Sequence, residues 1–82
     1  MSYGPFSHSE GYKTKAIGRA SHAQGIGNTA NNQGQCVVGK YATIDNNGMS
    51  IFQVGIGSSE INRRDALKID VEGNVTFGNS KG

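Results

Sequence analysis

The chain lacks the residues that build a large apolar core. Among its 82 residues there is no tryptophan, aromatic residues make up 7%, and 34% of the residues are hydrophobic. A domain of this size buries only about 60–65% of the surface that its unfolded chain exposes, and thirteen of its residues are glycine. We therefore expect a lone copy to be marginally stable, and an obligate homo-oligomer to supply the missing burial.

Cysteine, charge and long hydrophobic runs are also scarce. The single cysteine, Cys36, cannot form an intrachain disulfide; it is reduced, pairs between chains or packs as a small apolar residue, and we favour packing. The net charge of +2 comes from scattered residues, so no nucleic-acid partner is expected. No run could form a transmembrane helix and no signal peptide opens the chain, so no membrane insertion is expected. A surface-exposed role would come through assembly into a larger object or through a parent chain.

What the chain has is a glycine register. Glycine recurs every seven residues, with asparagine at one position of the series: Gly4, Gly11, Gly18, Gly25, Asn32 and Gly39. Glycine and asparagine are the residues that best tolerate positive φ, so this spacing predicts a turn after every short extended segment. Segments of this composition are often disordered, but disorder does not require a fixed register.

The segments between these turns repeat with a period of fourteen. Ser7–Gly11 is followed by Ser21–Gly25 and by Gln35–Gly39, so two strands and two turns predict one coil of a β-solenoid, with about three coils before Asp45. Strand alternation predicts an inner column of Ser9, Ala23 and Val37, a second inner column of Ala16, Ala30 and Ile44, and an opposite face with His8, His22 and Cys36 beside Glu10, Gln24 and Val38. We expect regular winding to loosen after Tyr41.

The second half of the chain predicts hairpins. A turn at Asp45–Gly48 is expected to join a strand at 41–44 to one at 50–54. A second hairpin alternates apolar and polar residues on either side of a turn at 72–74. Two strands alone are marginal in water, so three such hairpins are expected to close a trimeric β-prism around Leu67, Ile69, Val71, Val75 and Phe77. The predicted fold class is all-β, with a β-roll repeat region at 1–41 and a C-terminal hairpin and trimerisation region at 42–82.

The segment Gly4–Ala16, with Ser21-His22-Ala23-Gln24-Gly25 after it, resembles the G-x-x-S-H-A-E-G-x-x-T-x-A repeat of trimeric left-handed β-roll heads. Such heads occur in trimeric autotransporter adhesins and in tail-fibre proteins of phages and large viruses. The later segments 39–41, 51–57, 64–70 and 73–75 are similar to the region that follows these repeats in phage fibres. Ile17, Gln24, Asn31, Asn32 and Ala42 depart from the pattern.

The resemblance implies a non-enzymatic, structural and host-recognition module of a homotrimeric fibre, located on a virion or a cell surface. An alternative is the retained product of a self-cleaving fibre protein that assists trimer assembly. Binding to a cell-surface receptor, either glycan or protein, would act by avidity through three weak sites. Exposed turn and outer-face residues are the candidate contacts: Tyr12, Lys13, Lys15, Arg19, Asn28, Asn31 and Asn32.

Chemistry has few candidates. His8, His22 and Cys36 are of metal-ligating types and share one column, but we favour hydrogen bonding of these side chains within a trimer core, and no metal or cofactor is expected. Ser7-His8 and Ser21-His22 are adjacent in sequence, and adjacent strand residues point to opposite faces. No catalytic residue is therefore predicted.

Overall fold

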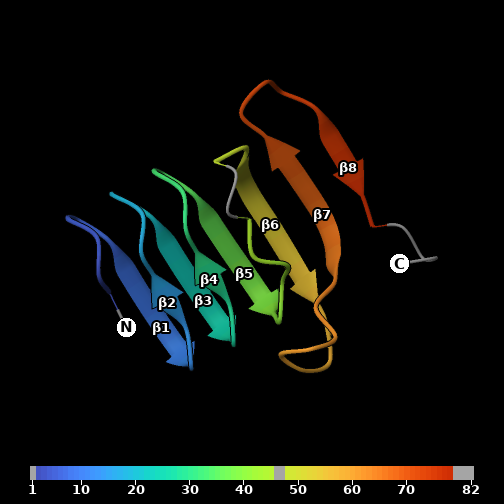
Figure 1. The fold of residues 1–82 in the computed structure, drawn as a ribbon, viewed down its shortest axis with the longest axis horizontal. Coiled ribbons are helices and arrows are strands. Elements are labelled where there is room, and N and C mark those ends of the chain that lie inside the picture. Colours follow the sequence, from blue (N-terminus) through green and yellow to red (C-terminus); the bar gives the residue numbers. More distant parts are fainter. Residues whose placement is uncertain (1, 46–47, 79–82) are drawn as a thin grey trace.

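The computed structural model describes residues 2–45 and 48–78, and these form an all-β solenoid of about three turns. Its eight strands are β1 (His8–Tyr12), β2 (Lys15–Ala16), β3 (His22–Ile26), β4 (Thr29–Ala30), β5 (Cys36–Lys40), β6 (Ser50–Ile56), β7 (Asp65–Asp70) and β8 (Val75–Phe77). One sheet has the order β1-β3-β5-β6-β7-β8, and the short strands β2 and β4 form the second (Figure 1). The molecule is 36 × 29 × 15 Å, so the two layers are thin.

Parallel pairing confirms the fourteen-residue coil. His8 pairs with His22 and His22 with Cys36, so equivalent residues stack directly. The predicted loosening after Tyr41 takes a specific form: Cys36 pairs with Phe52, sixteen residues later, again in parallel. The third coil therefore holds two more residues than the first two, and the long sheet continues across the predicted boundary at 41/42.

The predicted hairpin between 41–44 and 50–54 is wrong. β6 pairs in parallel with β5 and antiparallel with β7, and 41–44 belongs to no strand. The carboxylate of Asp45 closes the chain reversal instead, because its Oδ2 accepts hydrogen bonds from the backbone N–H groups of Met49 (3.1 Å) and Ser50 (2.6 Å). Asn46 and Asn47 of the predicted turn lie outside the described residues.

The turns place their left-handed residue two positions after each member of the glycine series. Two columns at this position have positive φ: Phe6 (60°), Ala20 (58°) and Gly34 (69°), then Lys13 (58°), Gly27 (65°) and Tyr41 (46°). A third column with positive φ belongs to the glycine series itself: Gly11 (111°), Gly25 (109°) and Gly39 (96°). Gly18 is needed for another reason, since a Cβ there would overlap the backbone of Asn32 on the next coil. Gly25 combines both needs, with φ of 109° and the Gly39 carbonyl in the space of its Cβ.

The apolar interior is small. Five residues with no exposed surface form it: Ala16, Ala23, Ala30, Val37 and Ala42. The predicted inner position of Ile44 is wrong, because Ile44 is 38% exposed. On the returning segment of this wider coil Ala42 is buried instead, and its N–H donates to Oδ1 of Asn28 (2.9 Å).

Towards the third coil the interior becomes polar. Gln35, Ser50 and Gln53 are completely buried. Gln35 Nε2 donates to Oγ of Ser50 (2.8 Å) and to Oε1 of Gln53. Gln53 Nε2 donates in turn to the carbonyl of Thr43 (2.8 Å) and to Oδ2 of Asp65 (3.0 Å). A hydrogen-bonded network therefore fills the space that alanine fills in the first coils.

The second predicted hairpin is present. Leu67 pairs with Phe77 and Ile69 with Val75 across β7 and β8. Val71, which we expected on the apolar face of the strands, follows β7 in the turn.

Candidate functional site

The long sheet has one face that no segment of the described chain covers along its apolar half. Strand alternation and register align two rows of side chains on this face. The first row is His8, His22, Cys36, Phe52, Ile69 and Val75, and the second is Glu10, Gln24, Val38, Val54, Leu67 and Phe77. We call this surface the outer face.

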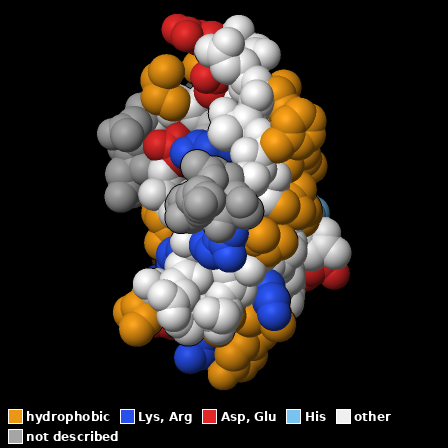
Figure 2. All heavy atoms as spheres, turned by 90° about the vertical axis from the view of Figure 1, so that its right-hand side faces the viewer, with side chains coloured by type: hydrophobic (Ala, Val, Ile, Leu, Met, Phe, Trp, Pro, Cys, Tyr) orange, Lys and Arg blue, Asp and Glu red, His pale blue; other side chains and the backbone are white. Residues whose placement is uncertain are grey.

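The outer face changes character along its length. It is polar on β1 and β3 and apolar from β5 to β8, where Phe77 is 76% exposed. Hydrophobic side chains are visible along the right-hand side of the end-on view in Figure 2. Cys36 lies at the change and is half-buried; burial raises the pKa of its thiol. An apolar, strand-built surface of this kind is suited to packing against another protein surface.

The polar end of the outer face carries two stacked imidazoles. The rings of His8 and His22 lie 4.8 Å apart between centroids, with an interplanar angle of 11°. His8 Nε2 is 3.0 Å from Oε1 of Glu10, and His22 Nε2 is 3.4 Å from Oε1 of Gln24. Within one chain, each ring therefore contacts the side chain two residues further along its own strand.

Cys36 is not the third member of the cluster. It pairs with His22 in the sheet, but the metal-ligating atoms that lie within 4.8 Å of one another belong to His8, Glu10 and His22. The sequence pattern alone did not single out Glu10, whose carboxylate contacts His8 and lies within 4.8 Å of a ring nitrogen of His22. The pattern that could have indicated this cluster is His-x-Glu on one strand with a histidine on the strand paired with it.

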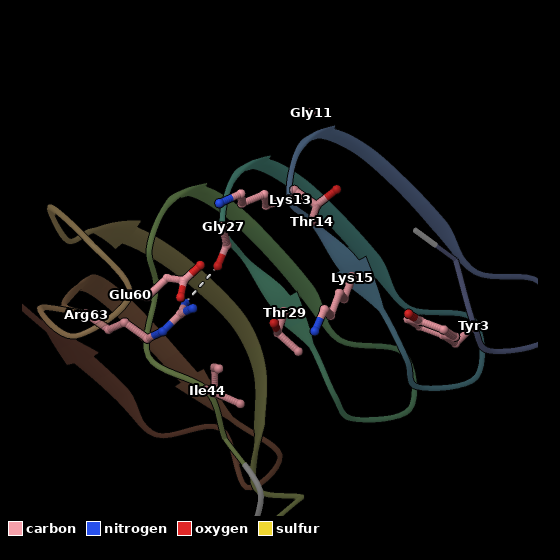
Figure 3. Close-up of a pocket in the computed structure, with 10 residues that line it drawn as sticks. All are labelled: Tyr3, Gly11, Lys13, Thr14, Lys15, Gly27, Thr29, Ile44, Glu60 and Arg63. Carbon is pink, nitrogen blue, oxygen red and sulfur yellow. Dashed lines mark hydrogen bonds between the residues drawn. The ribbon is translucent and has the colours of Figure 1, made fainter.

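A groove of about 550 Å³ lies over the short-strand layer, on the other side of the molecule (Figure 3). Ten residues line it: Tyr3, Gly11, Lys13, Thr14, Lys15, Gly27, Thr29, Ile44, Glu60 and Arg63. Lys13 and Lys15 come from the turn into β2 and from β2 itself, and both are exposed. The groove therefore has a basic wall and an aromatic side chain, Tyr3, at one end.

Arg63 connects the 58–64 segment to the coils at the edge of this groove. Its Nη1 donates to the carbonyls of Gly27 (2.7 Å) and Ala42 (3.1 Å), and its guanidinium lies 5.7 Å from the ring centroid of Tyr41. The guanidinium of Arg63 is therefore already engaged by groups of the same chain. The lysines, rather than Arg63, are the groove cations best placed to meet a ligand.

The predicted receptor residues fall into three groups. Lys13 and Lys15 line the groove, whereas Tyr12 and Arg19 are exposed elsewhere. Asn31 and Asn32 are half-buried, and Nδ2 of each donates to Asp45.

Asn28 has a structural role. Its side chain is completely buried, and Nδ2 donates to the carbonyls of Gln24 (2.6 Å) and Gly39 (2.9 Å). It is therefore unavailable to a ligand.

Sequence reasoning missed several groove residues. Thr29 could have been found, since the fourteen-residue period places it beside Lys15. Glu60 and Arg63 reach the groove from a segment outside the repeats, and no periodic signal marks them.

Comparisons with protein-family models, with curated proteins and with solved structures gave no match. Within the described residues, no helix has the length and hydrophobicity needed to cross a membrane.

Proposed function

We propose that this chain is a structural module of a homotrimeric fibre, in which the outer faces of three copies pack together. The observation that carries the proposal is the apolar half of the outer face, where Leu67 pairs with Phe77 and Phe77 is 76% exposed. The sequence motifs that resemble trimeric β-roll heads support the same assembly.

Burial supports an assembly over a lone chain. The apolar core of one copy contains four alanines and one valine, whereas larger apolar side chains occupy the outer face. Covering an apolar surface contributes about 25 cal/mol per Å². Packing the outer faces together would supply the hydrophobic stabilisation that the small interior cannot.

Threefold packing suits the hairpin in particular. β8 is the last strand of the sheet, and its apolar side chains Val75 and Phe77 are both exposed. Three hairpins arranged around an axis would bury these side chains with Leu67 and Ile69 in a small prism. The same arrangement would bring three copies of the polar end of the outer face near one another.

In this proposal the module is non-enzymatic, and the groove bearing Lys13 and Lys15 faces outward from the trimer to contact a receptor on a cell surface. Its two lysines and Tyr3 favour a ligand with anionic groups on a ring or chain. Three grooves on one stiff axis would bind by avidity. The location that fits is a virion fibre or a surface fibre.

The test of assembly is the solution mass by light scattering beside a far-ultraviolet circular dichroism spectrum. The unmodified chain should have the mass of three copies and a β spectrum. The Phe77→Asp variant should lose the mass of three copies and the β spectrum, because it places a charge in the proposed prism. The matched control Thr76→Asp, on the opposite face of β8, should keep the mass and the spectrum of the unmodified chain. A folded wild-type monomer, or a Phe77→Asp protein that keeps the trimer mass, would contradict the proposal.

The test of recognition is separate. Lys13→Ala with Lys15→Ala should reduce binding to the acidic members of a glycan array while the mass of three chains persists. Unchanged binding would remove the groove from the proposal and leave the assembly intact.

A further inference from the structure

We propose that His8, Glu10 and His22 of a single chain form a binding site for a divalent transition-metal ion such as Zn²⁺. The ligating atoms of the three side chains already lie within 4.8 Å of one another on the outer face. The inference goes beyond the proposed fibre function, since all three ligands come from one chain and none depends on a partner.

The fold brings these side chains together through its register. Parallel pairing places His22 directly opposite His8, and strand alternation returns Glu10 to the same face two residues after His8. The 4.8 Å separation of the stacked rings equals the spacing of neighbouring strands. The cluster is therefore held by the backbone of two paired strands, not by flexible loops.

The ligand chemistry suits zinc. Two imidazole nitrogens and one carboxylate oxygen are a set of three protein ligands that zinc accepts, with a fourth position left for water. Zinc bonds of about 2.0–2.2 Å require neighbouring ligand atoms to lie about 3.3–3.6 Å apart in a tetrahedral site. His8 Nε2 and Glu10 Oε1 are 3.0 Å apart, so this pair needs little adjustment.

His22 needs a larger movement. Its ring stacks in parallel with that of His8, so it must tilt for both nitrogens to point at one ion. The side chains of His8 and Glu10 are 57% and 59% exposed, and His22 is half-buried. Side chains at an exposed sheet surface change rotamer readily, so an ion can enter without opening the backbone.

The neighbouring positions refine the inference. Gln24 lies opposite Glu10 and approaches His22 Nε2 at 3.4 Å, so a carboxylate at this position would add a fourth ligand. Cys36 contributes less than its residue type suggests, because a thiol binds metal as the thiolate and burial of Cys36 favours the protonated form.

The experiment is a calorimetric titration of the full chain with ZnCl₂, after removal of metals with a chelator and without a histidine tag. One zinc ion per chain is expected. Glu10→Gln and His22→Gln should each weaken binding at least about tenfold, the loss found even for residues that only support a ligand. Gln24→Glu should tighten it, and Glu72→Gln, in the exposed turn after β7, should leave it unchanged.

Circular dichroism would show that each variant is folded, and the ring signals of His8 and His22 should shift together in nuclear magnetic resonance spectra as zinc is added. Absence of binding, or equal binding by the wild type, Glu10→Gln and His22→Gln, would overturn the inference. One zinc ion per three chains would overturn the single-chain site in favour of ligands shared across an axis. A ratio of one zinc ion per chain is expected whether the solution mass is that of one chain or three, so the zinc titration and the mass measurement test separate proposals.

Discussion

Ala20 and Gly34 occupy equivalent positions of successive coils, and both have left-handed backbone conformations, with φ of 58° and 69°. Ala20 pays the steric cost of this conformation, about 1–2 kcal/mol for a residue with a Cβ, whereas Gly34 does not. No atom lies within 4 Å of the place where a Cβ would be built on Gly34. A Cβ at position 34 would therefore add backbone strain without meeting a neighbouring atom.

We predict that Ala20→Gly stabilises the protein and Gly34→Ala destabilises it, each by roughly 0.5–1 kcal/mol after the greater freedom of glycine in the unfolded chain is deducted. The free energy of unfolding, from urea denaturation at one protein concentration, measures both changes. The double variant should return close to the wild type. Stabilisation by Gly34→Ala would contradict the assignment of strain to this turn.

The buried amides make a second prediction. Gln53 donates to Thr43 and Asp65 and accepts from Gln35, and all of these groups would lose a partner in Gln53→Leu. A buried polar group without a hydrogen bond costs about 1–3 kcal/mol, so we expect a loss of roughly 2–4 kcal/mol in the free energy of unfolding.

Two variants make this test specific. Gln33→Leu, at an exposed position, should change the free energy of unfolding by no more than about 0.5 kcal/mol. Adding Gln35→Leu to Gln53→Leu should increase the loss further, because the hydrogen bonds of Gln35 to Oγ of Ser50 and from the N–H of Asn32 are then also broken. If Gln53→Leu alone is neutral, the amide network does not stabilise the third coil.

The sequence predicted the stacking of the first coils correctly and the content of the third incorrectly. The period of fourteen was sufficient to align His8, His22 and Cys36, because each coil repeats the same turns. It could not reveal the sixteen-residue coil, whose two extra residues fall in a segment without glycine register. The period also suggested an apolar interior, yet Gln53 lies opposite Val37 and is satisfied by Gln35 and Asp65, which are distant in sequence.

The candidate sites follow the same division. The His8, Glu10 and His22 cluster depends on local register and was accessible from the spacing of these residues. The groove could be predicted only in part. Lys15 and Thr29 are neighbours because of the fourteen-residue period, but Arg63 reaches the second coil through a hydrogen bond to the carbonyl of Gly27, thirty-six positions earlier in the chain. Long-range contacts of a non-repeating segment leave no periodic trace.

Asp70 gives a prediction on pH. Its Oδ1 accepts hydrogen bonds from the backbone N–H groups of Asn74 and Glu72, both at 2.9 Å, and Oδ2 accepts one from Nδ2 of Asn74 at 3.1 Å. These bonds, those from Asn74 first, lower the pKa of the Asp70 carboxyl below its ordinary value. Because the folded-state pKa is lowered, the stabilisation is present above the unfolded pKa of about 3.9 and is lost as the pH falls through the lower folded value.

We therefore expect the amide proton signals of Glu72 and Asn74 to shift together on acidification, with a midpoint below about pH 3.9. Nuclear magnetic resonance spectra recorded from neutral to acid pH would measure this midpoint. Asp70→Asn should abolish the joint shift while leaving the other carboxyl titrations in place. A midpoint at or above the ordinary value would show that the turn does not favour the carboxylate.

Arg63 gives the last prediction, on how the non-repeating segment is attached. Its guanidinium joins the carbonyls of Gly27 and Ala42, which belong to different coils, and lies over the ring of Tyr41. Hydrogen bonds from a charged donor contribute about 1.5–3 kcal/mol, so we expect Arg63→Ala to lower the free energy of unfolding by about 1–3 kcal/mol after the half-exposed position is considered. Arg63→Lys should recover only part, because an ammonium does not stack over the ring of Tyr41 as the planar guanidinium does.

The readout that separates attachment from general stability is amide hydrogen exchange. Loss of the Arg63 contacts should speed exchange in the 58–64 segment, where Ser58 N–H is bonded to the carbonyl of Asn62, more than exchange in β1 and β3. Arg19→Ala, at an exposed turn position, should leave both regions unchanged. Equal acceleration throughout the sheet would mean that Arg63 stabilises the solenoid as a whole, and that the 58–64 segment is held by its own backbone hydrogen bonds.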